Sequence, residues 1–195
     1  MDVINATNVI FLTLPHNKKG VLMKTNGIAE IKKSIKNISQ AELAEICVKL
    51  ARFKKDNKEY LHFLLFESSD PLAYAEDVKE SLHNSLTNLN RHPSLKVKEL
   101  RKHLRHLSRH IRYTSSAEVE ITLLIWFADM LVAHAGVRHS NKALYTLFVR
   151  QIEKIRKTFP KLHEDLQFDY KQPYDDLLDR SADDISGFNK DQYKL

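Results

Sequence analysis

Cysteine, glycine and proline are scarce in this chain of 195 residues, which contains one, four and five of them respectively. A single cysteine, Cys47, leaves no partner for an internal disulfide, for a cysteine-based zinc cluster or for a CxxC redox pair. The shortage of glycine and proline argues against an all-β fold, whose many turns use both residues. It argues against a disordered chain as well. These shortages favour a helical protein in a reducing compartment.

Long hydrophobic runs are missing too. The most apolar segment, residues 121–136, contains Asp129 and His134 and is too short to span a bilayer. The apolar segment 8–15 is short, and an acid rather than lysine or arginine precedes it, so it does not match a secretory signal. We therefore expect a soluble, cytoplasmic protein with no membrane partner.

Motifs of known chemistry are absent from the sequence. It has no glycine-rich phosphate loop, no HExxH, no GxSxG and no nucleotide fingerprint. Their absence does not exclude catalysis, but it favours a protein that is not an enzyme and that uses no cofactor.

Helical patterns fill most of the chain after Gly27. Ser39 and Glu42 have the spacing of a capping box, and Asp56 and Glu59 repeat it before the apolar run 60–66. That run is apolar on all sides and predicts a buried helix rather than a buried strand. The segment from Glu118 to His134 is apolar round most of its circumference, which predicts the central helix.

The expected fold class is all-α, with seven to eight helices joined by short links as antiparallel helical hairpins. The sequence leaves open whether they form an irregular bundle or a degenerate array of helical pairs. The expected organisation is a flexible or irregular N-terminal arm over residues 1–25 and a single helical domain over 26–170. An acidic, loosely ordered tail over 171–195 follows, because Pro173 and many aspartates lie there.

The stretch 39-SQAELAEICVKLARFKKDNKEYLHFLLF-66 resembles the opening of a family of small, uncharacterised, all-helical bacterial proteins. The shared pattern is a capped helix, a lysine-rich link and an NKEYL sequence that leads a second helix. It covers about residues 28–66. The resemblance implies a bacterial cytosolic helical protein, and it transfers no site residues because the family has no assigned activity.

Charge is unevenly distributed along the chain. The formal net charge is +6, and it divides into −5 over residues 164–195 and +11 over residues 1–163. A basic body with an acidic tail indicates an anionic partner or self-masking. We hypothesise that residues 164–195 partly mask the cationic surface described next.

The most basic stretch is 101-RKHLRHLSRHIR-112, with four arginines, one lysine and three histidines. On a helix from Ser94 to Arg112, one stripe is apolar, a second is cationic and a third carries the histidines. The cationic stripe consists of Lys98, Arg101, Lys102, Arg105, Arg109 and Arg112. Such a stripe can bind a nucleic acid through its phosphates, can bind an acidic protein, or can simply be the solvated side of a structural helix. Aromatic side chains for base stacking are absent from it.

The histidine stripe offers a metal site as an alternative. His103, His106 and His110 are spaced by three and four residues, and Glu99 lies on the same stripe. Three imidazoles with an open position are the ligand set of a catalytic zinc. Ligands on one straight helix seldom converge on one ion, and the flanking cations repel a divalent metal. The sequence therefore predicts no metal, with these histidines as the candidates if one is bound.

Asp129 is the candidate buried polar residue, because it lies within the most apolar segment. A buried carboxylate needs a partner, and an Arg or His of the adjacent basic helix is the expected one. The catalytic alternative makes Asp129 a general base beside His134 or His139.

These features together predict a non-catalytic helical interaction module that contacts an acidic partner through its basic helix. A nucleic-acid-binding protein that uses the cationic face of residues 98–112 is the first alternative. A small helical enzyme or metal-binding protein, using Asp129 or the histidine stripe, is the second. The sequence does not indicate an oligomeric state.

Overall fold

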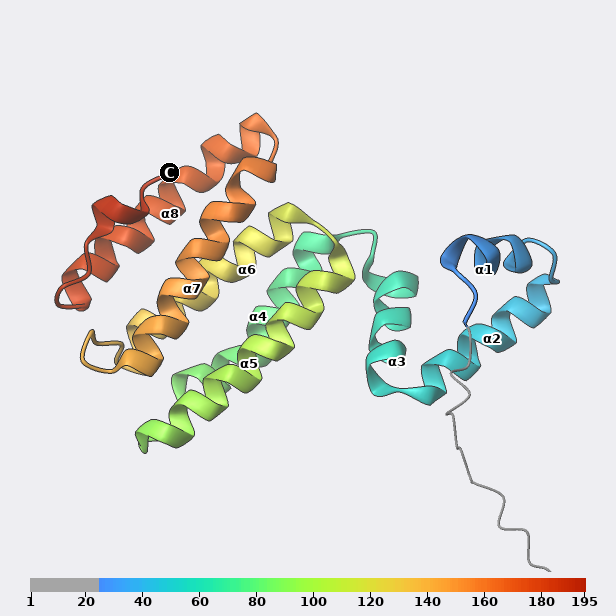
Figure 1. Cartoon of the computed structure of the whole chain (residues 1–195), viewed down its shortest axis with the longest axis horizontal. Helices are drawn as coiled ribbons and strands as arrows, with labels where there is room; N and C mark the ends of the chain where they lie inside the picture. The colour runs from blue at the N-terminus through green and yellow to red at the C-terminus, as the bar shows by residue number, and fades with distance from the viewer. Residues whose placement is uncertain (1–24) are drawn as a thin grey trace, which may run out of the picture. The chain divides into compact units, whose positions relative to one another are not determined.

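The computed structural model describes residues 25–195, and within them it contains eight α-helices and no strand (Figure 1). The helices are α1 (Ile28–Ile35), α2 (Gln40–Phe53), α3 (Lys55–His62), α4 (Pro71–Thr87), α5 (Pro93–Thr114), α6 (Ala117–Met130), α7 (Lys142–Thr158) and α8 (Glu164–Asp184). The all-α prediction is confirmed. The predicted arm falls, except for its last residue, outside the described residues, as does the apolar segment 8–15.

The chain divides into two compact units, with the boundary between Ile46 and Cys47 inside α2. This boundary differs from the predicted single domain over residues 26–170. Before it, the predicted capping box is formed: the Ser39 amide donates to the Glu42 carboxylate at 2.9 Å, and the Glu42 amide donates to Ser39 Oγ at 3.2 Å. The two contacts satisfy donors that the first turn of α2 leaves unpaired.

Helix ends in the unit from Cys47 to Leu195 follow from local sequence. Asp70 caps α4 by accepting a hydrogen bond from the Ala73 amide at 2.9 Å, and Pro71 occupies the first helical position. Ser116 caps α6 in the same way. Gly136, with φ of 66°, ends the π-helical turn that extends α6, because glycine adopts the left-handed conformation at little cost.

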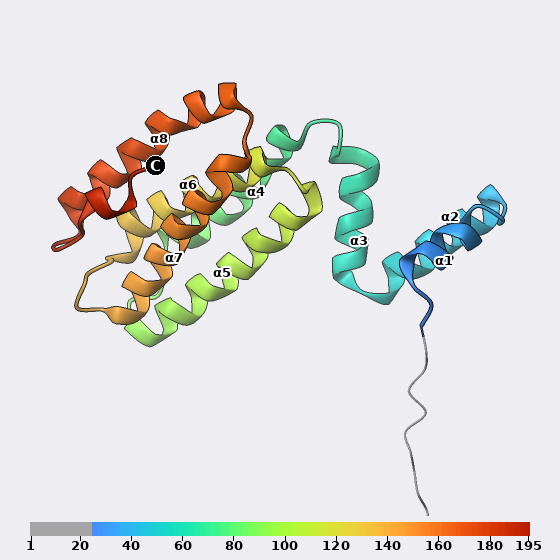
Figure 2. The ribbon, with the colours of Figure 1, turned by 45° about the horizontal axis from the view of Figure 1, so that its top comes forward.

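The hydrophobic core of this unit is built round α6. Leu123, Leu124 and Phe127 are fully buried on it, and α6 packs against α4, α5, α7 and α8 (Figures 1 and 2). Neighbours on several sides are what a helix with little polar surface requires. The predicted central position of this helix is confirmed. No helix of the described residues is both long and apolar enough to cross a membrane.

The apolar run 60–66 is helical, as expected, but it is not buried. Phe63 alone lies in the core, whereas Leu64, Leu65 and Phe66 are exposed. The predicted second capping box is also wrong, because α3 begins at Lys55 and its N-cap is Lys54. Asp56 and Glu59 point to a partner on α5 instead.

Residues 171–195 do not form the loosely ordered tail that we expected. Residues 171–184 continue α8, with Pro173 inside the helix. Tyr174, Leu177, Ile185 and Phe188 are buried in the core, so the segment contributes apolar contacts despite its acidic composition.

A pair of substitutions on α8 tests this placement. Replacement of the fully buried Leu177 by Ala should lower the free energy of unfolding by about 2–5 kcal/mol, because it removes buried methyl groups and leaves a cavity. Phe168→Ala, at a side chain that is 82% exposed on the same helix, should change it by less than about 0.5 kcal/mol. Urea unfolding followed by circular dichroism measures both. Equal effects would show that the segment is not part of the core.

Candidate functional site

Helix α5 presents three different faces, as its sequence indicates. Val97, Leu100, Leu107 and Ile111 are buried against the bundle, and Leu104 is half-buried. The burial of this stripe fixes the rotation of α5 about its axis. The arginines of the opposite stripe are therefore directed away from the core.

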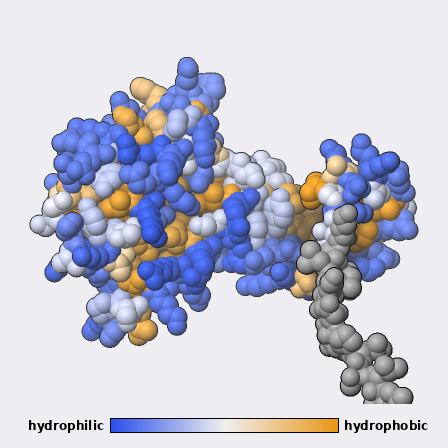
Figure 3. All heavy atoms as spheres, viewed as in Figure 1, coloured by the Kyte–Doolittle hydropathy of each residue, from blue (hydrophilic) through white to orange (hydrophobic). Residues whose placement is uncertain are grey.

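An open groove of about 910 Å³ runs along the cationic side of α5. Apolar surface lies between hydrophilic side chains on the face of the bundle that Figure 3 shows. Side chains from four helices line the groove: Asp56 of α3, Leu82 of α4, Arg150 of α7 and, from α5, Arg101, Lys102, His103, Leu104, Arg105, His106, Ser108, Arg109 and Arg112.

The groove brings together most of the cations predicted from the sequence. Five of the six line it, and Lys98 does not, although it is exposed on the same helix. Arg150 was not predicted, because nothing in the α7 sequence shows that α7 lies near the arginines of α5. The tertiary structure therefore adds a cation from a second helix to the predicted face.

Most of these cations have no acidic partner. Within the described chain, Arg109 is the only one of the six predicted residues that forms an ion pair; the other five, Lys98, Arg101, Lys102, Arg105 and Arg112, are exposed and unpaired. Arg150 is exposed and unpaired in the same sense. Like charges held together in one groove produce a local positive potential, which attracts anions.

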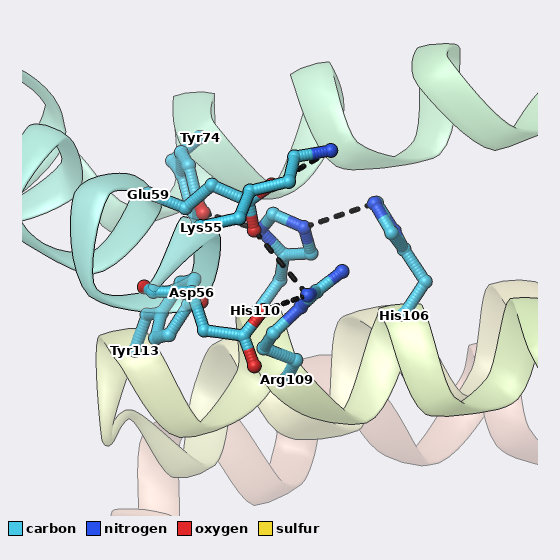
Figure 4. Close-up of polar contacts among 8 residues, drawn as sticks. All are labelled: Lys55, Asp56, Glu59, Tyr74, His106, Arg109, His110 and Tyr113. Carbon is cyan, nitrogen blue, oxygen red and sulfur yellow. Dashed lines mark hydrogen bonds and ion pairs between the residues drawn. The ribbon is translucent and has the colours of Figure 1, made fainter. Parts of the chain in front are cut away.

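Arg109 attaches α3 to α5 (Figure 4). It is hydrogen-bonded to the Asp56 carboxylate, and its Nη1 lies 3.6 Å from Glu59 Oε2, a distance that gives an ion pair without a hydrogen bond. The Tyr113 hydroxyl donates to the Asp56 carbonyl at 3.0 Å, and its ring stacks on Tyr60 at 5.1 Å between centroids. These contacts place Asp56 in the groove lining, beside the cations.

Tyr74, His110 and His106 form a hydrogen-bonded row beside this contact (Figure 4). The Tyr74 hydroxyl contacts His110 Nδ1, and the two histidine Nε2 atoms lie 3.3 Å apart. Burial raises the pKa of Tyr74 to about 12, so its hydroxyl keeps its proton. This proton finds an acceptor when Tyr74 donates to His110 Nδ1 and His110 Nε2 donates to His106 Nε2.

All three histidines of α5 are held in the neutral form. Burial, reinforced by the neighbouring His106, lowers the pKa of His110 to about 4. Burial is also the main cause that lowers the pKa of His106 and of His103. Neutral imidazoles carry no charge, so the arginines and Lys102 supply the positive charge of the groove.

The histidines do not form a metal centre in the described part of the chain. No group of three or more His, Cys, Asp or Glu residues there could hold a metal ion. His106 and His110 contact each other, while His103 is directed toward Glu99, with His103 Nε2 3.9 Å from Glu99 Oε1. The three side chains thus share a stripe without converging on one point.

Asp129 is paired, but not with the basic helix. Its Oδ1 lies 2.8 Å from Arg180 Nη1 on α8, and its side chain is 31% exposed rather than fully buried. The predicted partner on α5 is wrong, because α8 packs against this side of α6. The depression that Asp129 lines contains no histidine, so the predicted general-base pairing with His134 or His139 is not formed.

The acidic segment does not mask the groove. Helix α8 lies on the side of the bundle away from α5 in both ribbon views (Figures 1 and 2). Within residues 25–195, no ion pair joins residues 164–195 to the six predicted cations. Asp179 and Asp191 pair with Lys190 and Lys194 of the same segment, and Asp165 Oδ2 lies 3.3 Å from His163 Nδ1. The acid that lines the groove is Asp56 of α3, which precedes α5 in the sequence.

Arg180 binds Asp129 of α6, whereas Asp179 and Asp191 bind Lys190 and Lys194 within the C-terminal segment itself. The packing of α8 against α6, on the side away from α5, keeps the acidic segment apart from the basic helix.

The buried histidine predicts how stability depends on pH. Because the pKa of His110 falls from 6.5 to about 4 on folding, the unfolded chain takes up a proton there in the range between these values and the folded chain does not. The free energy of unfolding therefore falls as the pH drops from about 6.5 toward 4, because protonation of His110 in the unfolded chain favours unfolding. His110→Gln keeps an acceptor for Tyr74 and cannot titrate, so its free energy of unfolding should fall less between pH 7 and pH 5.

Urea unfolding of the wild type, His110→Gln and His83→Gln at the two pH values measures this difference. His83 is exposed on α4, and its variant should show the same fall as the wild type. An equal fall in all three proteins would mean that His110 is charged in the folded state.

Comparison of the chain with protein-family models, with curated proteins and with solved structures finds no match. The resemblance of residues 28–66 to uncharacterised bacterial helical proteins stays a prediction.

Proposed function

We propose that this protein is a non-catalytic interaction module that binds an acidic segment of a partner protein in the groove along α5. The observation that carries the proposal is the set of five unpaired cations lining one groove, namely Arg101, Lys102, Arg105, Arg112 and Arg150. Unpaired arginines that line one groove offer several bidentate sites for carboxylates. An acidic partner would be steered to the groove by the positive potential and oriented by these contacts.

The lining of the groove favours a protein over a nucleic acid. Leu82 and Leu104 provide apolar surface that a phosphate backbone does not use, and Asp56 would repel phosphates. Aromatic side chains, on which the bases of a single strand stack, are absent from the lining.

Nucleic-acid binding is the second candidate, and the excess of arginine over lysine favours it. Four arginines of α5 and Arg150 line the groove beside the single Lys102. Arginine binds phosphate oxygens in the same bidentate way as carboxylates, so duplex binding without sequence preference is the outcome to test against the first proposal.

Binding of poly-L-glutamate and of a DNA duplex, each labelled and followed by fluorescence anisotropy over a salt series, tests the proposal. We expect poly-L-glutamate to bind at low salt and to be released as salt rises, because the contact is electrostatic. Arg101→Glu/Arg105→Glu/Arg112→Glu should weaken this binding by at least about 100-fold, since each site becomes repulsive.

The matched control is Lys157→Glu/Lys161→Glu/Lys171→Glu, which changes the net charge equally at exposed lysines that do not line the groove. It should lose far less affinity than the arginine variant. Equal losses would show that net charge, not the groove, attracts the ligand. No binding of either polymer by the folded protein at low salt would refute the proposed function.

A further inference from the structure

Helix α3 contacts α5 and already places one carboxylate, that of Asp56, in the groove lining. Asp56 and Glu59 are three residues apart on α3, so they lie on the same face of that helix, and both contact Arg109. Tyr60 of α3 stacks on Tyr113, which adds an apolar contact to the ion pairs. An acidic helical segment therefore fits against this end of α5.

The other arginines of the cationic stripe lie on the same face of α5 as Arg109. Arg101, Arg105, Arg109 and Arg112 follow one another at spacings of four, four and three residues, which keeps them on one face of α5. The stretch extends about 16 Å at 1.5 Å per residue, or about three helical turns. A second helix lying along α5 with carboxylates at the same spacings would place one acid beside each arginine.

The floor of the groove is suited to the apolar side of such a helix. Leu104 is half-buried between the arginines, and Leu82 reaches the lining from α4. The methylene groups of the arginines extend this apolar surface while their charged ends stay at the rim. A helix with acids flanking a leucine stripe would bury its leucines on the floor and pair its acids at the rim.

Arg109 is not saturated by α3. Its buried Nε has no hydrogen-bond partner within the described residues, and Glu59 is too distant from Nη1 for a hydrogen bond. The Asp56 side chain that pairs with it is 58% exposed, so an incoming carboxylate can reach this end of the groove and compete with Asp56 and Glu59 for the guanidinium.

We propose that the partner segment is an acidic amphipathic helix that lies along α5, and that α3 competes with it for the end of the groove at Arg109. The proposal rests on the proposed function, because it specifies the ligand of the same groove. It adds two properties: the ligand must be patterned as a helix, and removal of the α3 carboxylates must strengthen its binding.

The first experiment compares two synthetic peptides of about 18 residues with the same composition of Glu, Leu and Ala. One carries leucines at spacings of three and four with glutamates beside them, and the other has the same residues scrambled so that no leucine stripe forms. Titration by fluorescence anisotropy should show the patterned peptide binding about tenfold more tightly, a difference of about 1.4 kcal/mol.

The second experiment repeats the titration with Asp56→Asn/Glu59→Gln, which frees Arg109. The patterned peptide should bind about two- to fivefold more tightly to this variant, the range expected when one exposed ion pair becomes available. The control is Asp183→Asn/Asp184→Asn, which changes the net charge equally on exposed residues of α8 and should gain less. Circular dichroism establishes that each variant retains its helix content.

The outcomes separate this inference from the proposed function. Equal affinities for the two peptides would overturn the helical ligand while leaving a groove that binds acidic chains. An Asp56→Asn/Glu59→Gln affinity no higher than that of the α8 control would overturn the competition by α3. Tighter binding of a DNA duplex than of the patterned peptide would overturn the protein partner, and no binding of either peptide or of poly-L-glutamate would refute the function itself.

Discussion

The enclosure of α6 is the constraint on which the larger unit depends. This helix is apolar round most of its surface, so it is stable in water only when other helices cover it on several sides. Helices α4, α5, α7 and α8 supply that cover, each with one apolar stripe. Because α5 turns its only apolar stripe to the core, its cations must lie at the surface. The groove is thus a consequence of how the core is closed.

The packing of the helices, rather than the net charge of each part of the sequence, decides which acidic and basic side chains meet. The acids of α8 are held on the side of the bundle away from α5, where Arg180 pairs with Asp129 and Lys190 pairs with Asp179. The acids that do meet the basic helix come from α3, which has little net charge. Neighbouring arginines that lack partners repel one another, and a carboxylate ligand would relieve this repulsion. A binding role for the groove is consistent with this electrostatic arrangement.

Features that depend on residues within one helix were predicted correctly from the sequence. Features that depend on contacts between distant segments were not. The capping box at Ser39 and the apolar stripe of α5 each depend on residues within a single helix, and both are formed. The segment after residue 170 was judged by its aspartates and Pro173, whereas its placement depends on Leu177, Ile185 and Phe188 finding space in a core made by other helices. Composition could not show that this space exists.

The sequence alone determined that the described chain is helical, where α2 begins, and which face of α5 carries the cations. Side-chain periodicity and hydrogen-bond capping act within a single helix, so they can be read without a fold. Only the tertiary structure decided that Arg150 joins those cations, that Asp56 and Glu59 bind Arg109 instead of capping their own helix, and that Asp129 pairs with α8. Each of these contacts joins residues that are far apart in the sequence, and the packing of whole helices, rather than any local preference, brings them together.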